Sequence, residues 1–123
     1  MKKFDFIIGN PPYQETKGGT KNVDIWPSFV DNANVVADNV CMIHPGRWLI
    51  PKKQMKSTHE KIINSGLIDF DYYPNASKVF NGVEIDGGVT VTVFKKGYRG
   101  ICVSALVSRP QDMRGYRSYW AFY

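Results

Sequence analysis

The first forty residues alternate between short apolar runs, a polar stretch and one amphipathic segment. Residues 4–8 (Phe-Asp-Phe-Ile-Ile) are mostly apolar and stop abruptly at a glycine, an asparagine and two prolines, which predicts a buried strand. Residues 14–22 are polar and include two adjacent glycines, which predicts a loop. Apolar side chains then recur at helical spacing through residues 26–37, with Asp24 as the expected N-cap and Pro27 in the first turn. A strand, a loop and a helix are therefore expected in this order.

The middle of the chain repeats the pattern of strand and helix. Residues 40–43 (Val-Cys-Met-Ile) predict a second buried strand, which closes at a histidine, a proline and a glycine. A second helix is expected from about residue 52 to residue 65, because its apolar positions follow a helical period and Gly66 suits its end. Residues 67–73 predict a third strand, and the glycine-containing residues 74–88 predict an irregular connection. This alternation favours parallel strands with helices packed against them.

The carboxyl-terminal part of the chain changes character. Residues 89–94 alternate β-branched side chains and predict a strand, with which residues 101–107 are expected to pair as an antiparallel hairpin across residues 95–100. Residues 108–123 form a basic and aromatic tail without a clear period. We therefore expect one α/β domain over residues 1–107, with a mixed parallel and antiparallel sheet that ends in this hairpin, followed by the tail.

Composition restricts the class of protein. The chain has 123 residues, of which 43% are hydrophobic and 14% aromatic, as in a globular domain rather than a disordered segment. Its apolar runs are too short for a membrane helix and its first residues do not resemble a secretory signal, so a cytoplasmic protein is expected. Cys41 and Cys102 lack a second cysteine or a histidine at metal-ligand spacing, so no metal site is expected.

The net charge of +5 is concentrated in two basic clusters. Residues 47–61 contain five basic residues and one acidic residue, and residues 95–117 contain six basic residues and one acidic residue. Clusters of this kind favour an anionic partner such as nucleic acid.

One tetrapeptide carries the most specific chemical signal in the chain. Asn10, Pro11, Pro12 and Tyr13 directly follow the first predicted strand, at the edge of an α/β sheet where ligands usually bind. An amino group conjugated to a ring is a poor nucleophile, so a site that methylates it must accept its hydrogen bonds. The Asn10 side-chain carbonyl and the Pro11 backbone carbonyl can serve as acceptors, which the rigid prolines hold in place. The Tyr13 ring offers a flat face for a base that has been flipped out of its stack.

Residues 4–14, which contain this tetrapeptide, resemble the catalytic motif of the amino-methyltransferases that use S-adenosylmethionine. More narrowly, they are similar to the adenine methylases of restriction–modification systems, especially large fused restriction–modification proteins. The similarity continues in residues 25–33, 42–49 and 79–89, and it spans residues 4 to about 96 in total. Only the first block is specific for the chemistry, and the others indicate the subfamily.

The resemblance implies roles for the tetrapeptide and a fold for the chain. Asn10 and Pro11 would accept hydrogen bonds from the adenine amino group, and Tyr13 would stack on the adenine. The implied fold is the Rossmann-like methyltransferase fold, in which residues 4–8 form the fourth strand, residues 40–43 the fifth, and the later hairpin the last two.

The resemblance also implies a cofactor site that this sequence does not contain. In this family S-adenosylmethionine is held by a glycine-rich turn and an acidic residue that precede the catalytic motif, and here the motif begins at residue 10. We therefore expect the second half of the sheet only, as a fragment or subunit of a DNA adenine N6-methyltransferase. By itself the chain is expected neither to bind S-adenosylmethionine tightly nor to methylate DNA. The other half of the domain, a partner subunit or a homodimer through the exposed edge of the first strand would complete it.

Four further residues are candidate substrate contacts. His44 ends the second predicted strand and would contact the base or a phosphate, unless it is a structural histidine. Arg47, Lys52 and Lys53 lie just beyond it and are candidate phosphate contacts, because cationic side chains near a flipped base meet the DNA backbone.

Two other functions remain open. The tetrapeptide would equally serve the methylation of a protein glutamine amide, which is also planar. The absence of a glycine-rich cofactor turn fits a non-catalytic half-domain that binds DNA or a protein partner. The later sequence blocks and the basic clusters favour the DNA methyltransferase.

Overall fold

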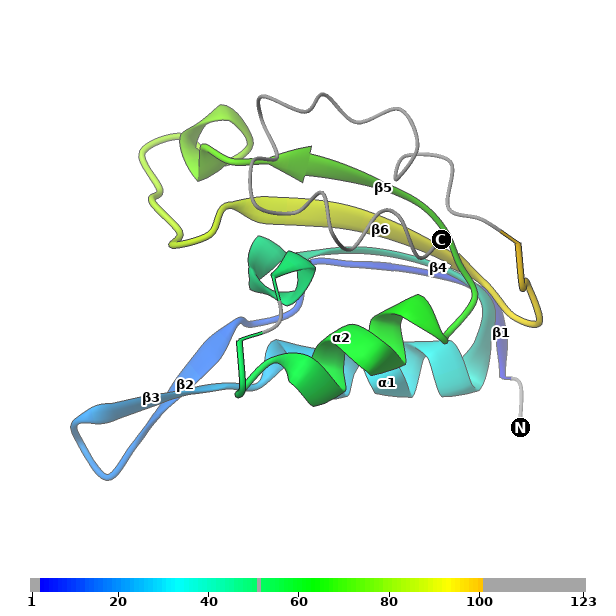
Figure 1. The fold of residues 1–123 in the computed structure, drawn as a ribbon, viewed down its shortest axis with the longest axis horizontal. Coiled ribbons are helices and arrows are strands. Elements are labelled where there is room, and N and C mark those ends of the chain that lie inside the picture. Colours follow the sequence, from blue (N-terminus) through cyan, green and yellow to red (C-terminus); the bar gives the residue numbers. More distant parts are fainter. Residues whose placement is uncertain (1–2, 51, 101–123) are drawn as a thin grey trace.

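Four strands form one mixed sheet (Figure 1). The computed structural model describes residues 3–50 and 52–100. In the order of the sheet, the strands are β1 (Phe4–Gly9), β4 (Ala37–Pro45), β6 (Val89–Lys95) and β5 (Leu67–Tyr73). β1 and β4 are parallel, whereas β6 is antiparallel to both of its neighbours. The expected α/β class with a mixed sheet is confirmed, as part of a methyltransferase-like sheet.

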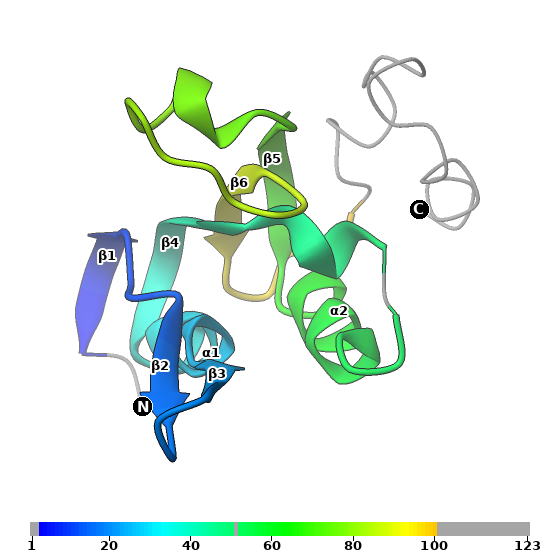
Figure 2. The same ribbon diagram turned by 90° about the vertical axis from the view of Figure 1, so that its left-hand side faces the viewer.

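Two α-helices lie on the same face of the sheet in both views (Figures 1 and 2). α1 (Trp26–Val36) connects β1 to the parallel strand β4, and α2 (Lys56–Ile63) precedes β5. The short 3-10 turns η1 (Gly46–Leu49) and η2 (Ala76–Lys78) follow β4 and β5. A parallel strand pair needs a crossover connection, and α1 provides it. In the described part of the chain, no helix has the length and apolar character needed to cross a membrane.

The face beneath the helices contains the core. Its buried apolar side chains are Trp26, Val30, Ala33, Ala37, Val40, Met42, Trp48, Leu49, Ile62, Leu67, Phe70 and Phe94. The helical stripe expected from the sequence is present, since Trp26, Val30 and Ala33 are all buried on α1. Each large apolar side chain removed from water contributes about 1.5–3 kcal/mol.

The opposite face, called the open face below, presents apolar side chains to solvent. It includes Phe4, Phe6 and Ile8 of β1, which retain 54%, 71% and 82% of their exposure. Cys41 and Val93 continue this face on the neighbouring strands and are half-buried. The first predicted strand is therefore a strand, but the expectation that it is buried is wrong, because alternate side chains of β1 point away from the helices.

The segment between β1 and α1 is a hairpin, so the prediction of a loop is wrong. β2 (Gln14–Lys17) pairs antiparallel with β3 (Lys21–Asp24), and the hairpin extends away from the sheet (Figure 1). Gly18 and Gly19 have φ angles of 64° and 80°, which let the chain reverse tightly enough for two polar strands to pair.

The prediction of a terminal hairpin is also wrong in its pairing. β6 hydrogen-bonds to β4 on one side and to β5 on the other, so neither of its edges is available to another strand. Residues 74–88 return the chain beside β5, and this places the antiparallel strand inside the sheet rather than at its edge. The expected partner, residues 101–107, and the proposed boundary between residues 107 and 108 lie outside the described residues.

Two helix boundaries differ from the sequence predictions. α1 has Ile25 at its N-cap without a side-chain hydrogen bond, because Asp24 belongs to β3 and bonds elsewhere. α2 begins at Lys56 rather than near residue 52, since the preceding residues form a turn closed by a bond of 2.7 Å from the Met55 N–H to the Lys52 carbonyl.

Candidate functional site

The tetrapeptide leaves the sheet at the carboxyl end of β1, beside the end of β4. Pro11 is buried, Tyr13 is half-buried, and Asn10 and Pro12 are exposed. The carboxyl edge of parallel strands is the usual place for ligands in open α/β sheets. The expected site residues of β1 and the end of β4, including His44, therefore gather at one edge.

Two hydrogen-bond acceptors of the tetrapeptide are unpaired. Within residues 3–50 and 52–100, neither the Asn10 side chain nor the Pro11 carbonyl has a hydrogen-bond partner. Neighbouring backbone groups are used differently, since the Tyr13 carbonyl accepts from the Ile25 and Trp26 N–H groups at 3.0 and 3.4 Å. An acceptor without a partner can pair with the N–H donors of a ligand, and of these two residues Asn10 is exposed and Pro11 is buried.

The Tyr13 ring is held by packing rather than by its hydroxyl group. The ring lies against the core cluster, and its hydroxyl oxygen is buried without a partner in the described part of the chain. Burial raises the pKa of Tyr13 above its usual value of 10.0, so the phenol is neutral at physiological pH. A ligand therefore cannot reach the hydroxyl group of Tyr13. The residue is suited to stacking on a ligand rather than to proton transfer.

His44, the last residue but one of β4, is fully buried on the helix side. Its ring stacks on Trp26, with centroids 4.5 Å apart and planes 8° from parallel. Its Nδ1 lies 3.1 Å from the Pro45 carbonyl, which can only accept, so Nδ1 carries the hydrogen. Its Nε2 then accepts from the Thr92 hydroxyl group at 2.8 Å. Burial lowers the pKa of His44 to about 4, although the bond to Pro45 opposes this shift. These surroundings favour the structural histidine over a contact with base or phosphate.

A chain of buried polar groups extends from His44 to α2. The Thr90 hydroxyl group donates to the His44 carbonyl at 3.3 Å and accepts from Trp48 Nε1 at 2.9 Å. The Trp48 carbonyl lies 2.8 Å from Nδ1 of His59 on α2. Buried polar groups with partners rigidify a core, so this chain fixes the end of β4 and η1 beneath the tetrapeptide.

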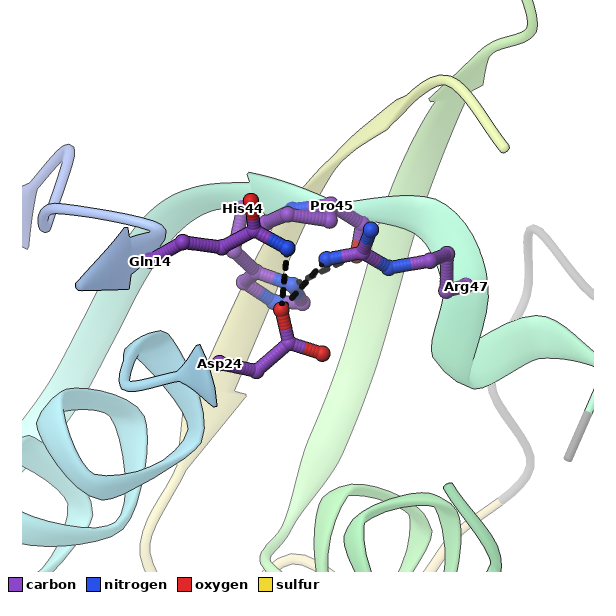
Figure 3. Close-up of polar contacts among 5 residues, drawn as sticks. All are labelled: Gln14, Asp24, His44, Pro45 and Arg47. Carbon is purple, nitrogen blue, oxygen red and sulfur yellow. Dashed lines mark hydrogen bonds and ion pairs between the residues drawn. The ribbon is translucent and has the colours of Figure 1, made fainter. Parts of the chain in front are cut away.

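Arg47 binds an acidic partner within the chain (Figure 3). Its Nη2 lies 2.7 Å from Oδ1 of Asp24, and the same oxygen accepts from Nε2 of Gln14 at 2.9 Å. The two charged side chains are 26% and 22% exposed, so water screens them only partly. Nε of Arg47 is buried and has no partner among the described residues. Lys52 and Lys53, by contrast, are exposed in the turn before α2, where they can meet a phosphate.

Part of this chain matches the profile of a known family. Residues 1–80, from the amino terminus through η2, match the family profile of the Eco57I restriction-modification methylase. The chain belongs to the Eco57I restriction-modification methylase family. It is also 30% identical over 107 residues to a Mycoplasma pneumoniae protein named "Uncharacterized adenine-specific methylase". That similarity covers 81% of this chain and 25% of the relative, so the chain spans about a quarter of the relative's length. The expected adenine methylase family is confirmed.

The glycine pair of this Eco57I-family chain serves packing. A Cβ added to Gly87 would lie 2.9 Å from Cγ of Arg47, and one added to Gly88 would collide with the Tyr73 carbonyl. The Gly88 carbonyl also accepts from the Gly46 N–H at 2.9 Å. Gly87 and Gly88 therefore dock the connection before β6 against the end of β4, and they do not form a cofactor turn. In the described ranges, no three His, Cys, Asp or Glu side chains converge as a metal site.

Three residues contact the candidate site residues without any sign of it in the local sequence. Asp24 was interpreted as a helix cap, and its pairing with Arg47 joins positions 23 apart, which no local pattern reveals. Thr90 and Thr92 were interpreted only as β-branched strand residues, although both hydroxyl groups contact His44. Only the structure reveals these contacts. It shows that Thr90 and Thr92 are fully buried, and a buried hydroxyl group needs a hydrogen-bond partner.

Proposed function

We propose that this chain carries the target-adenine pocket of an S-adenosylmethionine-dependent DNA adenine N6-methyltransferase from a restriction–modification system. The observation that carries the proposal is the pair of unpaired acceptors, Asn10 and Pro11, beside the half-buried ring of Tyr13. Membership of the Eco57I family and the similarity to a protein named as an adenine-specific methylase support DNA adenine as the substrate.

The two acceptors act on the amino group of the target base. The lone pair of that nitrogen is delocalised into the adenine ring, so the nitrogen is a weak nucleophile. When its N–H groups donate to the Asn10 side chain and the Pro11 carbonyl, electron density shifts toward the nitrogen and its lone pair can leave the ring plane. Pro11 has a fixed φ and Pro12 has no N–H, so the acceptors keep their positions. Acceptors held in this way lower the barrier without reorganisation during the reaction.

Tyr13 holds the base after it has left the duplex. Flipping a base out of its stack costs a few kcal/mol. Stacking on an aromatic side chain returns about 1–3 kcal/mol. The two backbone bonds to the Tyr13 carbonyl and the packing of its ring against the core keep this surface in one position.

The described residues do not fit a site for the methyl donor. Their glycine pair before β6 is occupied by Arg47 and the Tyr73 backbone. We therefore propose that this chain alone does not bind S-adenosylmethionine tightly and is inactive alone. The donor site then lies in other polypeptide, and "the complete enzyme" below means this chain together with that polypeptide. Micromolar binding of the donor to this chain in a calorimetric titration would contradict this part of the proposal.

The open face and the outer edge of β1 support completion by another polypeptide. β1 is the last strand of the sheet among the described residues, so the backbone groups on its outer side have no sheet partner there. Phe4, Phe6 and Ile8 are exposed on the same strand. An open edge next to apolar side chains is a site for strand pairing. We propose that the cofactor-binding half, a partner subunit or a second copy covers it. Sedimentation that finds this chain strictly monomeric, with the β1 amides unprotected from hydrogen exchange, would exclude the second copy.

Lys52 and Lys53 are the proposed phosphate contacts. Both are exposed, so they can reach the backbone of a bound duplex without losing a partner in the core. Charge reversal to Glu at both positions in the complete enzyme should weaken DNA binding and reduce the slope of log K against log salt by about 2. The matched control is charge reversal of Lys17 and Lys21, which are exposed on the β2–β3 hairpin and lie outside both basic clusters. Equal effects of the two double variants would contradict a contact at Lys52 and Lys53.

Transfer of a labelled methyl group tests the function itself. The complete enzyme should label DNA that contains adenine, and this chain alone should not. Asn10→Ala should reduce the turnover number by roughly a hundredfold or more, because it removes a group aimed at the reacting nitrogen. Asn32→Ala, an exposed asparagine on α1, is the matched control and should retain activity. Labelling of a glutamine peptide instead of DNA would favour the amide methyltransferase, and DNA binding without labelling would favour the binding module.

A further inference from the structure

Three segments of the chain meet at one carboxylate oxygen. Oδ1 of Asp24 accepts from Nη2 of Arg47 at 2.7 Å and from Nε2 of Gln14 at 2.9 Å (Figure 3). Charge-assisted bonds of this length are about twice as strong as bonds between neutral groups. The ion pair between α1 and α2, Lys61 with Asp31, is longer at 3.4 Å and more exposed. Among described contacts, the Arg47–Asp24 pair therefore combines short geometry with partial shielding from water.

The pair joins the base of the hairpin to the end of β4. Gln14 and Asp24 are opposite each other at the open end of β2 and β3, and Arg47 lies in η1 directly after β4. Tyr13 precedes Gln14, and its carbonyl accepts from the N–H of Ile25, which follows Asp24. Asp24 is therefore next to a residue that is hydrogen-bonded to Tyr13, and its second partner, Gln14, is next to Tyr13 in the chain.

The hairpin depends on contacts at its base. All four residues of β2 and the first two of β3 are exposed, so the hairpin has little packing along its length. A two-stranded hairpin without packing is marginally stable in water. The direction of the hairpin must therefore be set where it joins the rest of the fold. The same contacts set the course of the backbone at Tyr13.

The glycine pair Gly87 and Gly88 holds the Arg47 side chain in one position. Its Cγ lies where a side chain on Gly87 would be, and Gly87 has a φ of 81° that favours glycine. The Gly46 N–H binds the Gly88 carbonyl at 2.9 Å, which docks the glycine pair on the other side. Because the aliphatic part of the Arg47 side chain is enclosed, its guanidinium group is fixed relative to the end of β4. The ion pair then holds Asp24 in a fixed position as well.

We propose that Arg47 is a positioning residue for the target base: through Asp24 it sets the hairpin and the Tyr13 side of the pocket. This proposal rests on the proposed function, and it replaces the expectation that Arg47 contacts a phosphate. A guanidinium that is neutralised by Asp24 offers little net attraction to DNA, whereas Lys52 and Lys53 keep their full charge at the surface.

Kinetics of the complete enzyme separate the two roles. Arg47→Met and Asp24→Asn should each lower kcat by roughly tenfold or more, because small displacements at a reacting centre are costly. Both should change KM for DNA and the salt dependence of binding little. The double variant should be no worse than either single variant, since both remove the same interaction. Arg47→Lys should restore part of kcat. Asp31→Asn, which breaks the pair with Lys61, is the matched control and should leave kcat unchanged.

Hydrogen exchange on this chain gives a readout that does not depend on methyl transfer. Breaking the pair should speed exchange of the β2–β3 amides by roughly tenfold, while the amides of α1 and β4 stay protected. Unchanged exchange in the hairpin would overturn the proposal. So would a variant Arg47→Met that raises KM for DNA and flattens the salt dependence when Asp24→Asn does neither. If the complete enzyme transfers no methyl group to DNA, the proposed function fails, and the exchange result still decides whether the pair sets the hairpin.

Discussion

The two faces of the sheet treat neighbouring residues of the same strands in opposite ways. On the helix side, β4 and β6 bury His44, Thr90 and Thr92 completely, and each of these polar side chains has a partner. On the open face, β1 exposes Phe6 and Ile8 to 71% and 82%. A few polar side chains are thus buried beside the apolar core, while apolar side chains of β1 are exposed, and both cases depart from the usual preference.

The difference indicates which side of the sheet is packed within the described residues. On the helix side the buried side chains of His44, Thr90 and Thr92 have hydrogen-bond partners, whereas Nε1 of Trp26 is buried without one among the described residues. On the open face, the aromatic side chains contribute little to stability while they are exposed. Covering them with another surface would contribute about 1.5–3 kcal/mol for each. Asn10 and Tyr13 follow the carboxyl end of β1, the strand that carries the exposed apolar side chains. Substitutions on the two faces should therefore have unequal effects.

The largest contrast is expected between Trp26 and Phe6. Trp26→Ala removes a fully buried ring that stacks on His44, and it should reduce the free energy of unfolding by about 3–5 kcal/mol. Phe6→Ala removes a ring that is already mostly in water, and it should cost under about 1 kcal/mol. Urea unfolding of both variants measures the contrast. Equal losses would mean that the open face is as well packed as the helix side.

The pH dependence of stability should identify the buried imidazole. The pKa of His44 is lowered from 6.5 to about 4 in the folded chain, so the unfolded chain binds a proton first as pH falls. The free energy of unfolding therefore has its full contribution from neutral His44 above about pH 6.5. This contribution, on the order of 3 kcal/mol, is lost as the pH falls toward 4. The difference in unfolding free energy between the unaltered chain and His44→Gln, measured across this window, isolates this contribution from the carboxylates. A difference that does not vary with pH would refute it.

Thr92 and Val93 are adjacent on β6 and face opposite sides of the sheet. Thr92→Val keeps the shape but leaves Nε2 of His44 without its donor, which should cost about 1–3 kcal/mol. Val93→Thr places a hydroxyl group on the open face, where water can bind it, and it should cost under about 1 kcal/mol. Thermal unfolding compares the two, and a larger loss for Val93→Thr would reverse the assignment of the faces.

The smallest effect on stability is expected at Ile8. Ile8→Thr keeps a β-branched side chain at an 82% exposed position and should change the unfolding free energy by no more than about 0.5 kcal/mol. Self-association, followed by sedimentation at increasing concentration, should nevertheless decrease if the open face is the contact. Unchanged self-association would mean that the open face is not the contact, and would favour pairing through the outer edge of β1.

Local patterns predicted much of this fold. Helical spacing located α1, apolar runs located β1, β4 and β5, and the alternating residues of β6 located that strand. Patterns failed where pairing is decided between distant segments. The polar residues of β2 and β3 have no alternation that announces a hairpin, and nothing local shows that β6 inserts between β4 and β5.

The sequence alone determined the tetrapeptide, its position after a strand and, through the resemblance, the adenine methylase family. These properties depend on residues that are close together in the chain, and of them the family is confirmed by the match of residues 1–80. The tertiary structure decided the burial of His44, the pairing of Arg47 with Asp24 and the exposure of β1. Each of these depends on distances between residues that only folding brings together, and hydrogen bonds and burial act over a few ångströms regardless of separation along the chain.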